Sequence, residues 1–218
     1  MLRDGAGKNW TRHIISVVPG SYPIYCAGAD LDGDRDVDLV VADFGDNTIR
    51  WYENHAHVHD KPNFWNDTSI NRRWSTHVIA TDAMGVRTVS AADIDGDGDL
   101  DVLAAARSDT AGVTWYENVG VQSGLWKSHK IGENQQEGAY FAVPVDMDRD
   151  GDIDALSASV WASTVSWYEN MDRIGESWSK HEIATGAAGA CSVFGIDMNG
   201  DNWTDVLSTN LASNIVAW

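Results

Sequence analysis

Short apolar segments recur along the whole chain, each four to eight residues long, rich in Val, Ile, Trp and Tyr and bounded by Gly, Asp, Asn and Ser. No segment keeps a 3.6-residue hydrophobic period for ten residues or more, so the pattern predicts strands rather than helices. In one stretch the expected strands A, B, C and D span residues 140–146, 153–159, 164–170 and 178–184. The pattern therefore predicts an all-β chain.

Three sequence motifs recur in a fixed order. The first is a nine-residue frame rich in Asp, read as "DLDGDRDVD", "DIDGDGDLD", "DMDRDGDID" and "DMNGDNWTD", which begins at Asp30, Asp93, Asp146 and Asp197. The second is "WYEN", which begins at Trp51, Trp115 and Trp167, with Trp218 at the corresponding place in the last copy. The third is W-x-x-H, which begins at Trp10, Trp74, Trp126 and Trp178. This order, found four times, indicates a repeat protein.

Four short strands in about 50 residues, repeated four times, are typical of a β-propeller, in which each repeat is one four-stranded blade. We expect a single domain over residues 1–218 with four blades per chain. The approximate blade limits are residues 20–80, 84–132, 136–184 and 188–218, together with an N-terminal strand at residues 10–16.

The two ends of the chain predict how the ring closes. The N-terminal strand carries the motif of a D strand, whereas the last repeat supplies only strands A, B and C. The N-terminal strand can therefore complete the last blade and pair its open edge. This arrangement fits a single four-bladed ring and equally fits two chains that exchange D strands in an eight-bladed homodimer. The sequence leaves both alternatives open.

Composition adds a charge that is concentrated in the Asp frames. The chain of 218 residues is 43% hydrophobic and has a formal net charge of −18. The frames contain 18 of the 33 acidic residues. No basic surface is available for phosphate contacts, which argues against a nucleic-acid partner. No apolar run is long enough to span a membrane.

The spacing of the frame suits a cation with oxygen ligands. Carboxylates at positions 1, 3, 5 and 9 and the backbone carbonyl of position 7 can surround one point, and hard oxygen ligands favour calcium over zinc. Without a cation the carboxylates would repel one another. An EF-hand is excluded because its Glu at position 12 is replaced by Val41, Ala104, Ser157 or Ser208. The competing hypothesis is a solvated acidic loop.

The stretch "ADIDGDGDLDVLAA…VTWYEN" resembles the FG-GAP or VCBS repeat, the calcium-binding blade of integrin α-subunit heads and of many secreted bacterial and fungal proteins. The resemblance implies about four Ca²⁺ ions per chain. The implied side-chain ligands are Asp30, Asp32, Asp34 and Asp38; Asp93, Asp95, Asp97 and Asp101; Asp146, Asp148, Asp150 and Asp154; and Asp197, Asn199, Asp201 and Asp205. The implied carbonyl ligands belong to Asp36, Asp99, Asp152 and Trp203.

Two frames depart from the pattern of this family. Position 6, usually Gly, is Arg35 in the first frame and Asn202 in the fourth, and the fourth frame also has Asn199 in place of a carboxylate. We expect the first and fourth sites to be the weaker pair, because Arg adopts a positive φ less readily than Gly.

Propellers of this family serve as adhesion heads, as lectins and as the body of some polysaccharide lyases. The resemblance therefore implies a calcium-stabilised, secreted or cell-surface binding module for a glycan or a protein, and the chain as given shows no signal segment. We expect no enzymatic activity, because the Asp clusters are occupied as ligands and no nucleophile and base accompany them. The alternatives are the propeller body of a carbohydrate-active lyase or hydrolase, and a structural, self-assembling fragment of a larger protein.

Several residues lie outside the frames. The recurring His13, His77, His129 and His181 are expected to pack and hydrogen-bond within the blades. The connection after the first WYEN is 12 residues longer than its counterparts, and His55, His57 and His59 in it would share one face if extended, as a ligand or metal site or simply a solvated loop. Trp65 and Trp161 are candidates for stacking on sugar rings. Cys26 and Cys191 are expected to be buried free thiols, with a bridge between the first and last repeats as the alternative.

Overall fold

The chain is described by a computed structural model over residues 2–3, 10–12, 14–55, 74–108, 112–120, 124–132 and 137–218. These residues form strands joined by turns and loops and include no α-helix, which confirms the all-β prediction. The strands are β1 (Leu2–Arg3), β2 (Trp10–Thr11), β3 (Pro23–Ala29), β4 (Asp38–Asp43), β5 (Thr48–Asn54), β6 (Trp74–Ala80), β7 (Val86–Ala92), β8 (Asp101–Ala106), β9 (Val113–Asn118), β10 (Trp126–Ile131), β11 (Ala139–Val145), β12 (Asp154–Ser159), β13 (Thr164–Asn170), β14 (Trp178–Thr185), β15 (Ala190–Ile196), β16 (Asp205–Asn210) and β17 (Ile215–Ala217).

The main strands form four antiparallel sheets that follow the order of the sequence. We name them blade 1 (β3 to β6), blade 2 (β7 to β10), blade 3 (β11 to β14) and blade 4 (β15 to β17). In each blade neighbouring strands are consecutive in the chain, as the A, B, C and D pattern predicts. Blade 4 has three strands among the described residues. Each Asp frame forms the turn between the first two strands of its blade.

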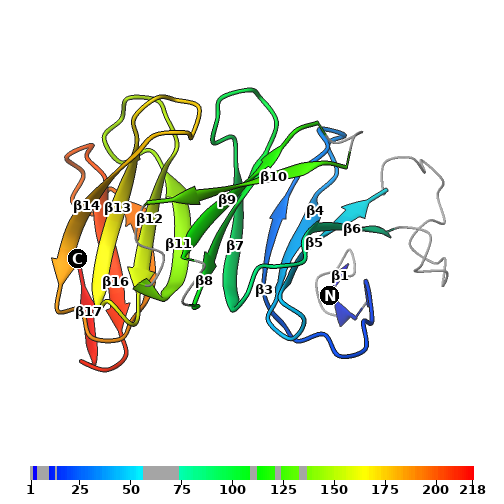
Figure 1. The fold of residues 1–218 in the computed structure, drawn as a ribbon, viewed down its shortest axis with the longest axis horizontal. Coiled ribbons are helices and arrows are strands. Elements are labelled where there is room, and N and C mark those ends of the chain that lie inside the picture. Colours follow the sequence, from blue (N-terminus) through cyan, green and yellow to red (C-terminus); the bar gives the residue numbers. More distant parts are fainter. Residues whose placement is uncertain are drawn as a thin grey trace.

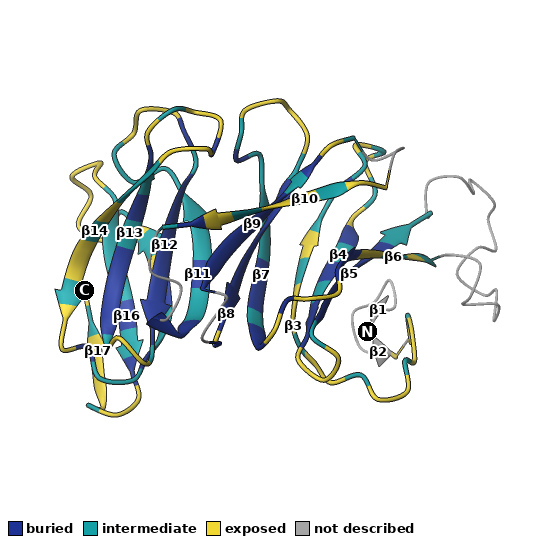
Figure 2. Cartoon of the chain, in the orientation of Figure 1, coloured by how far each residue is buried: buried dark blue, intermediate teal, exposed yellow. Residues whose placement is uncertain are grey.

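The blades lie in a row and pack face to face, as Figure 1 shows. Side chains alternate between the two faces of a strand, so a strand in the middle of the row contributes to two interfaces. Val102 and Ala104 of β8 pack in the cluster that includes blade 1, and Leu103 and Ala105 pack in the cluster shared with blade 3. Every residue of β8 and of β12 is therefore buried (Figure 2).

The described residues do not form the closed ring of a single chain, which was one of the two alternatives left open by the sequence. β2 pairs with β1 rather than with β17, with Leu2 opposite Thr11 and Arg3 opposite Trp10. The physical reason is visible in Figure 1, where the N-terminal strands and blade 4 lie at opposite ends of the row. The alternative in which two chains complete one ring stays a prediction.

The described part of the chain contains no helix with the length and apolar character needed to cross a bilayer.

Candidate metal centres

The first three Asp frames gather carboxylates from positions 1, 3 and 9. Their ligand oxygens lie within 4.8 Å of one another in each of three groups, which are Asp30, Asp32 and Asp38; Asp93, Asp95 and Asp101; and Asp146, Asp148 and Asp154. Figure 1 places the three frames on the turns that follow β3, β7 and β11. Three carboxylates at this separation are the kind of oxygen donor set that a divalent cation uses.

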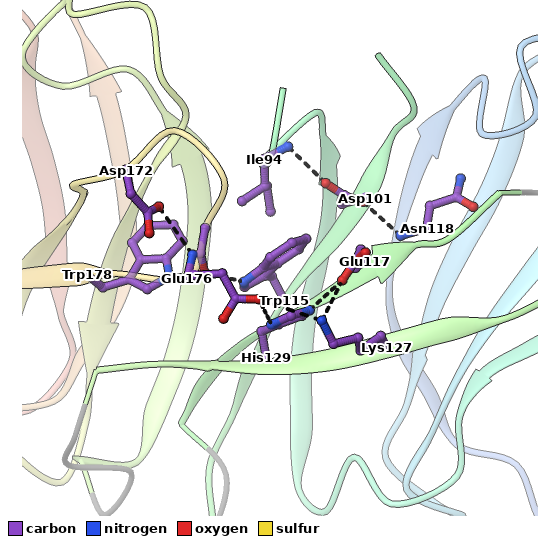
Figure 3. A network of polar contacts seen from close by, with 11 residues as sticks. Ile94, Asp101, Trp115, Glu117, Asn118, Lys127, His129, Asp172, Glu176 and Trp178 are labelled. Atoms are coloured by element: carbon purple, nitrogen blue, oxygen red, sulfur yellow. Dashed lines mark hydrogen bonds and ion pairs between the residues drawn. The ribbon is translucent and has the colours of Figure 1, made fainter. Parts of the chain in front are cut away.

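The Asp at position 9 is buried and joins the frame to the end of the third strand of its blade. Asp101 accepts the N–H of Ile94 at 2.9 Å and the N–H of Asn118 at 2.8 Å, as Figure 3 shows. Asp38 and Asp154 accept the same pair of bonds in their own blades. Burial raises the pKa of Asp101 to about 7, despite these hydrogen bonds.

The Asp at position 1 has one oxygen bound and one oxygen without a partner. Oδ2 of Asp30, Asp93 and Asp146 accepts the N–H of position 6, at 2.9, 3.1 and 3.3 Å respectively. Oδ1 of the same three residues is buried and has no hydrogen-bond partner. A buried carboxylate oxygen without a partner is costly, and a cation between the three carboxylates would satisfy it. The first three frames therefore fit a divalent metal ion.

The Asp at position 3 shapes the turn and faces the other carboxylates. Its Oδ1 accepts the N–H of position 5, at 3.1 Å for both Asp32 and Asp95. Burial, followed by the nearby carboxylates, raises the pKa of Asp32 to about 6. The same causes raise the pKa of Asp95 and of Asp148. Burial is thus the main cause of the raised pKa values, and repulsion between the neighbouring carboxylates adds to it.

The carboxylates at position 5 do not belong to the three clusters. Oδ1 of Asp34, Asp97 and Asp150 accepts the N–H of position 7, at 2.8, 2.8 and 3.0 Å. At position 7, the side chain of Asp152 forms an ion pair with Arg173 at 3.3 Å. The roles of positions 5 and 7 as metal ligands stay predictions.

All four frames hold two residues in the left-handed backbone region, one at position 4 and one at position 6. Position 6 is Arg35 (φ 76°), Gly98 (φ 97°), Gly151 (φ 96°) or Asn202 (φ 69°). Position 4 of the third frame is Arg149 (φ 66°). The sequence alone did not indicate that position 4 also requires a positive φ. Arg35 adopts the required conformation, and the first frame keeps the same three-carboxylate cluster as the second. The geometry gives no support to the expected weakness of the first site.

The fourth frame is built differently. Both oxygens of Asp197 accept backbone N–H groups, from Gly200 at 2.7 Å and from Asn202 at 2.9 Å. The amide of Asn199 donates to Asp201 at 3.0 Å. These contacts take the place of the buried, unpartnered oxygen of the other frames. The described residues of this frame form no cluster of three Asp, Glu, His or Cys side chains, since Asn199 stands at position 3. The weakness of the fourth site stays a prediction.

Two of the WYEN asparagines, Asn118 and Asn170, connect an Asp frame to the blade that follows it. The sequence alone did not predict this role. Nδ2 of Asn170 donates to the carbonyl of Ile94 in the preceding blade at 3.1 Å and to that of Ile153 in its own blade at 3.3 Å. Asn118 donates in the same way to Leu31 and Leu100. Asn recurs in all three copies of WYEN, and this recurrence could have indicated a structural role for it. Each of the first two frames is thus tied to the blade that follows it.

The recurring His residues are structural, as predicted, wherever the structure describes them. His129 stacks on Trp115 with ring centroids 4.3 Å apart, and its Nε2 lies 2.7 Å from Glu117 (Figure 3). His77 and His181 make the same stack and the same contact in blades 1 and 3. His13 lies outside the described residues.

The other candidate residues are separated in the structure. His55 contacts Ser75 at 2.7 Å through Nε2, within blade 1. His57, His59 and Trp65 lie outside the described residues. Trp161 is half-exposed in the turn between β12 and β13, and the Arg107 guanidinium lies 5.9 Å from its ring centroid. Both Cys26 and Cys191 are free, as predicted, but neither is buried. Cys191 is partly exposed, and Cys26 is exposed because no blade covers its face of β3.

Comparison with known proteins decides the family. The model of the FG-GAP-like repeat matches residues 30–104, 93–157 and 146–208. The chain belongs to this family. Each match of this FG-GAP β-propeller begins at position 1 of an Asp frame and ends in the second strand of the next blade. No curated protein gives a significant match.

A solved structure with a similar fold is that of a lectin from Agrocybe aegerita, studied for its specific recognition of non-reducing terminal N-acetylglucosamine. The two chains are 14% identical, with a TM-score of 0.51. The alignment covers 88% of this chain and 50% of the lectin chain, so this chain spans half the length of that neighbour. At this identity the similarity concerns the fold.

Proposed function

We propose that this FG-GAP propeller is a calcium-stabilised, non-catalytic binding module of the extracellular space whose ligand is a glycan. The observation that carries the calcium part is the buried Oδ1 without a partner on Asp30, Asp93 and Asp146, each beside two further carboxylates. The likeness to a lectin propeller supports a glycan over a protein as the ligand. Calcium favours a secreted or cell-surface location, where its concentration is high.

The carboxylates at positions 1, 3 and 9 would hold the ion in each of the first three frames. Bound calcium supplies positive charge that removes the repulsion between the carboxylates and satisfies the unpartnered oxygen. The residues of the frame then fix the turn between the first two strands of the blade. Through Asn118 and Asn170 the same turn is held against the next blade, so calcium would stabilise the junctions between blades.

Several contacts support a binding role over catalysis. The buried Asp residues at position 9 accept two backbone N–H groups each, which leaves them poorly placed to exchange protons with a substrate. His77, His129 and His181 are each held by a Trp stack and a Glu contact. The best surface feature for a sugar is Trp161, whose half-exposed ring is accompanied by Arg107.

Trp161 is held firmly in its turn. The turn is fixed by backbone bonds from Val160 to Gly138 and from Ala162 to Glu137. The ring lies so close to Gly138 that a Cβ added there would meet it at 2.5 Å. A rigid aromatic face with an adjacent cation is suited to stacking on a sugar ring and to bonding its hydroxyl groups.

Glycan binding is tested by screening the chain on a glycan array in calcium, with terminal N-acetylglucosamine included. We expect binding by the wild type, a loss of at least tenfold in affinity for Trp161→Ala, and unchanged affinity for Leu211→Ala. Leu211 is the matched control because it is exposed in the corresponding turn of blade 4. The glycan part of the proposal is overturned if the folded wild type binds no glycan.

Calcium binding is tested separately, by isothermal titration of the chain after treatment with EDTA. Saturable heat from Ca²⁺ together with a rise in the melting temperature supports the proposal. Equal melting temperatures in EDTA and in Ca²⁺ contradict it.

A further inference from the structure

The two ends of the row of blades expose faces whose counterparts pack inside the three junctions between blades. On blade 4, Val216 is 79% exposed and Trp218 is 69% exposed. The residues at the same positions in blade 2, Val113 and Trp115, are 2% and 1% exposed because blade 3 covers them. Blade 4 therefore ends in an apolar face shaped like one that packs against a following blade.

Blade 1 exposes the complementary face. Its Cys26 occupies the strand position of Val89, Ala142 and Val193, as their pairing with Val41, Ala104, Ser157 and Ser208 shows. Those three residues are buried against the preceding blade, whereas Cys26 is exposed. A cavity of about 680 Å³ opens on this face, lined by Tyr25, Cys26, Leu39, Val41 and Tyr52 and by the N-terminal Ile14 and Ile15.

These two faces are the two halves of one interface that the chain already forms three times. In each internal junction, the face of the earlier blade that corresponds to Val216 and Trp218 packs on the face of the later blade that corresponds to Cys26 and Leu39. Within one chain the two open faces cannot meet, since blades 1 and 4 stand at opposite ends of the row (Figures 1 and 2).

We propose that the open face of blade 4 in one copy of this chain packs on the open face of blade 1 in a second copy, and reciprocally, so that two copies close one ring. The occupant is a second copy because the same sequence already supplies both surfaces and their packing partners. The pairing is head-to-tail, and two such contacts related by a twofold axis close the assembly without leaving a free face.

One polar contact supports this pairing. Nδ2 of Asn118 and of Asn170 bonds a carbonyl of its own blade and also the carbonyl of frame position 2 in the preceding blade. Asn54, the equivalent residue of blade 1, bonds its own carbonyl at Val37 at 3.0 Å. In the assembly Asn54 would bond the carbonyl at position 2 of the fourth frame, Met198 of the second copy.

The test measures the molar mass of the full 218-residue chain in calcium, by light scattering after size exclusion. We expect twice the 23.8 kDa of one chain. Val216→Glu and Cys26→Arg should each give a folded monomer, and an equimolar mixture of the two variants should restore the dimer through the new Glu and Arg. Met84→Glu, a charge at an exposed apolar residue in the turn before β7, should leave the dimer intact.

A crosslink tests the contact itself. Thr209 occupies the position of Ala105 in blade 2, and Ala105 packs in one cluster with Ala142, the counterpart of Cys26. Because Sγ of Cys191 lies 3.4 Å from Oγ1 of Thr209 in the same chain, Cys191 is first replaced by Ser. In this background we expect Thr209→Cys to form a covalent dimer through native Cys26 under mild oxidation, and the further change Cys26→Ser to abolish it.

A wild type that is monomeric at all concentrations overturns the proposal and indicates an open arc or a ring closed by one chain. A dimer that Val216→Glu dissociates and Cys26→Arg leaves intact also overturns it, because that result indicates pairing of blade 4 with blade 4. Both results are independent of whether the chain binds a glycan.

Discussion

The second and fourth Asp frames have the same length and the same pair of left-handed residues, yet they arrange their carboxylates in opposite ways. In the second frame Asp93 keeps a buried oxygen without a partner beside Asp95 and Asp101. In the fourth frame Oδ1 of Asp197 accepts the N–H of Gly200, and Oδ2 accepts the N–H of Asn202. The comparison teaches that a turn of this shape can bind both oxygens of its first carboxylate with its own backbone or leave one of them buried without a partner. It also leads us to expect three calcium ions per chain, one fewer than the motif count.

Removal of calcium should have the largest effect. Each occupied site adds about 2.7 kcal/mol when free calcium is one hundred times its dissociation constant, so three sites add about 8 kcal/mol. For a chain of this size we expect the melting temperature to fall by at least about 15 °C in EDTA. Calorimetry in Ca²⁺ and in EDTA checks this, and Mg²⁺ should restore less of the loss. An unchanged melting temperature would mean that the first three frames, like the fourth, are not stabilised by calcium.

Asp93→Asn should remove one site and cost about 2.7 kcal/mol in saturating calcium, since the carboxylate that carries the unpartnered oxygen is lost. In EDTA the same change should be neutral or slightly stabilising, because it reduces the repulsion between carboxylates. Asp197→Asn is the matched control and should leave the number of bound ions unchanged. Native mass spectrometry counts the ions and urea denaturation gives the free energy of unfolding. Equal numbers of bound ions in the two variants would contradict the prediction that the second frame binds calcium and the fourth does not.

The stability of the metal-free chain should fall as the pH rises from about 4 to about 7. Burial raises the pKa of Asp101 to about 7 and the pKa of Asp154 and Asp32 to about 6, from the ordinary Asp value of 3.8. The folded chain therefore binds more protons than the unfolded chain over this interval, and its advantage is lost as the pH passes the folded pKa values. Urea denaturation in EDTA at pH 4.5 and pH 8 measures the difference. A chain more stable at pH 8 than at pH 4.5 would contradict the prediction.

Asn199→Asp should have the smallest effect. The change restores a carboxylate at position 3 of the fourth frame, but both oxygens of Asp197 remain bound to backbone N–H groups. We expect the ion count to stay at three and the free energy of unfolding to change by less than about 0.5 kcal/mol, as is usual for exposed sites. A fourth bound ion would show that the backbone arrangement gives way to calcium.

Much of the fold could be predicted from the sequence because the repeat is strict. The short apolar segments bounded by turn residues place strands such as β8 and β12, and the order of the three motifs gives the order of strands in each blade. The pairing of β2 with β1 could not be predicted. The D-strand motif indicates that a strand pairs at the edge of a sheet, but it does not indicate which sheet edge lies close enough. The exposure of Cys26 could not be predicted either, because it depends on blade 1 standing at the end of the row with no blade against this face of β3.

The candidate site could be predicted in its residue types but only partly in its geometry. The acidic spacing identified the three carboxylate clusters. It could not separate position 9 from position 5, because the partners of Asp101 include the N–H of Asn118, which is 17 residues away and is brought near by the fold. The altered fourth frame was signalled by Asn199 and Asn202. The positive φ of Arg149 could not be predicted, because Arg is not a residue that favours this backbone conformation.

The bonds from Asn118 and Asn170 to the preceding blade hold two of the three junctions in the row of blades. Among the described residues, the junction of blades 3 and 4 has no bond of this kind. In a linear array with nearest-neighbour coupling, the junction with the weakest interface separates first. Pulled or heated, a single chain should therefore open first between blades 3 and 4.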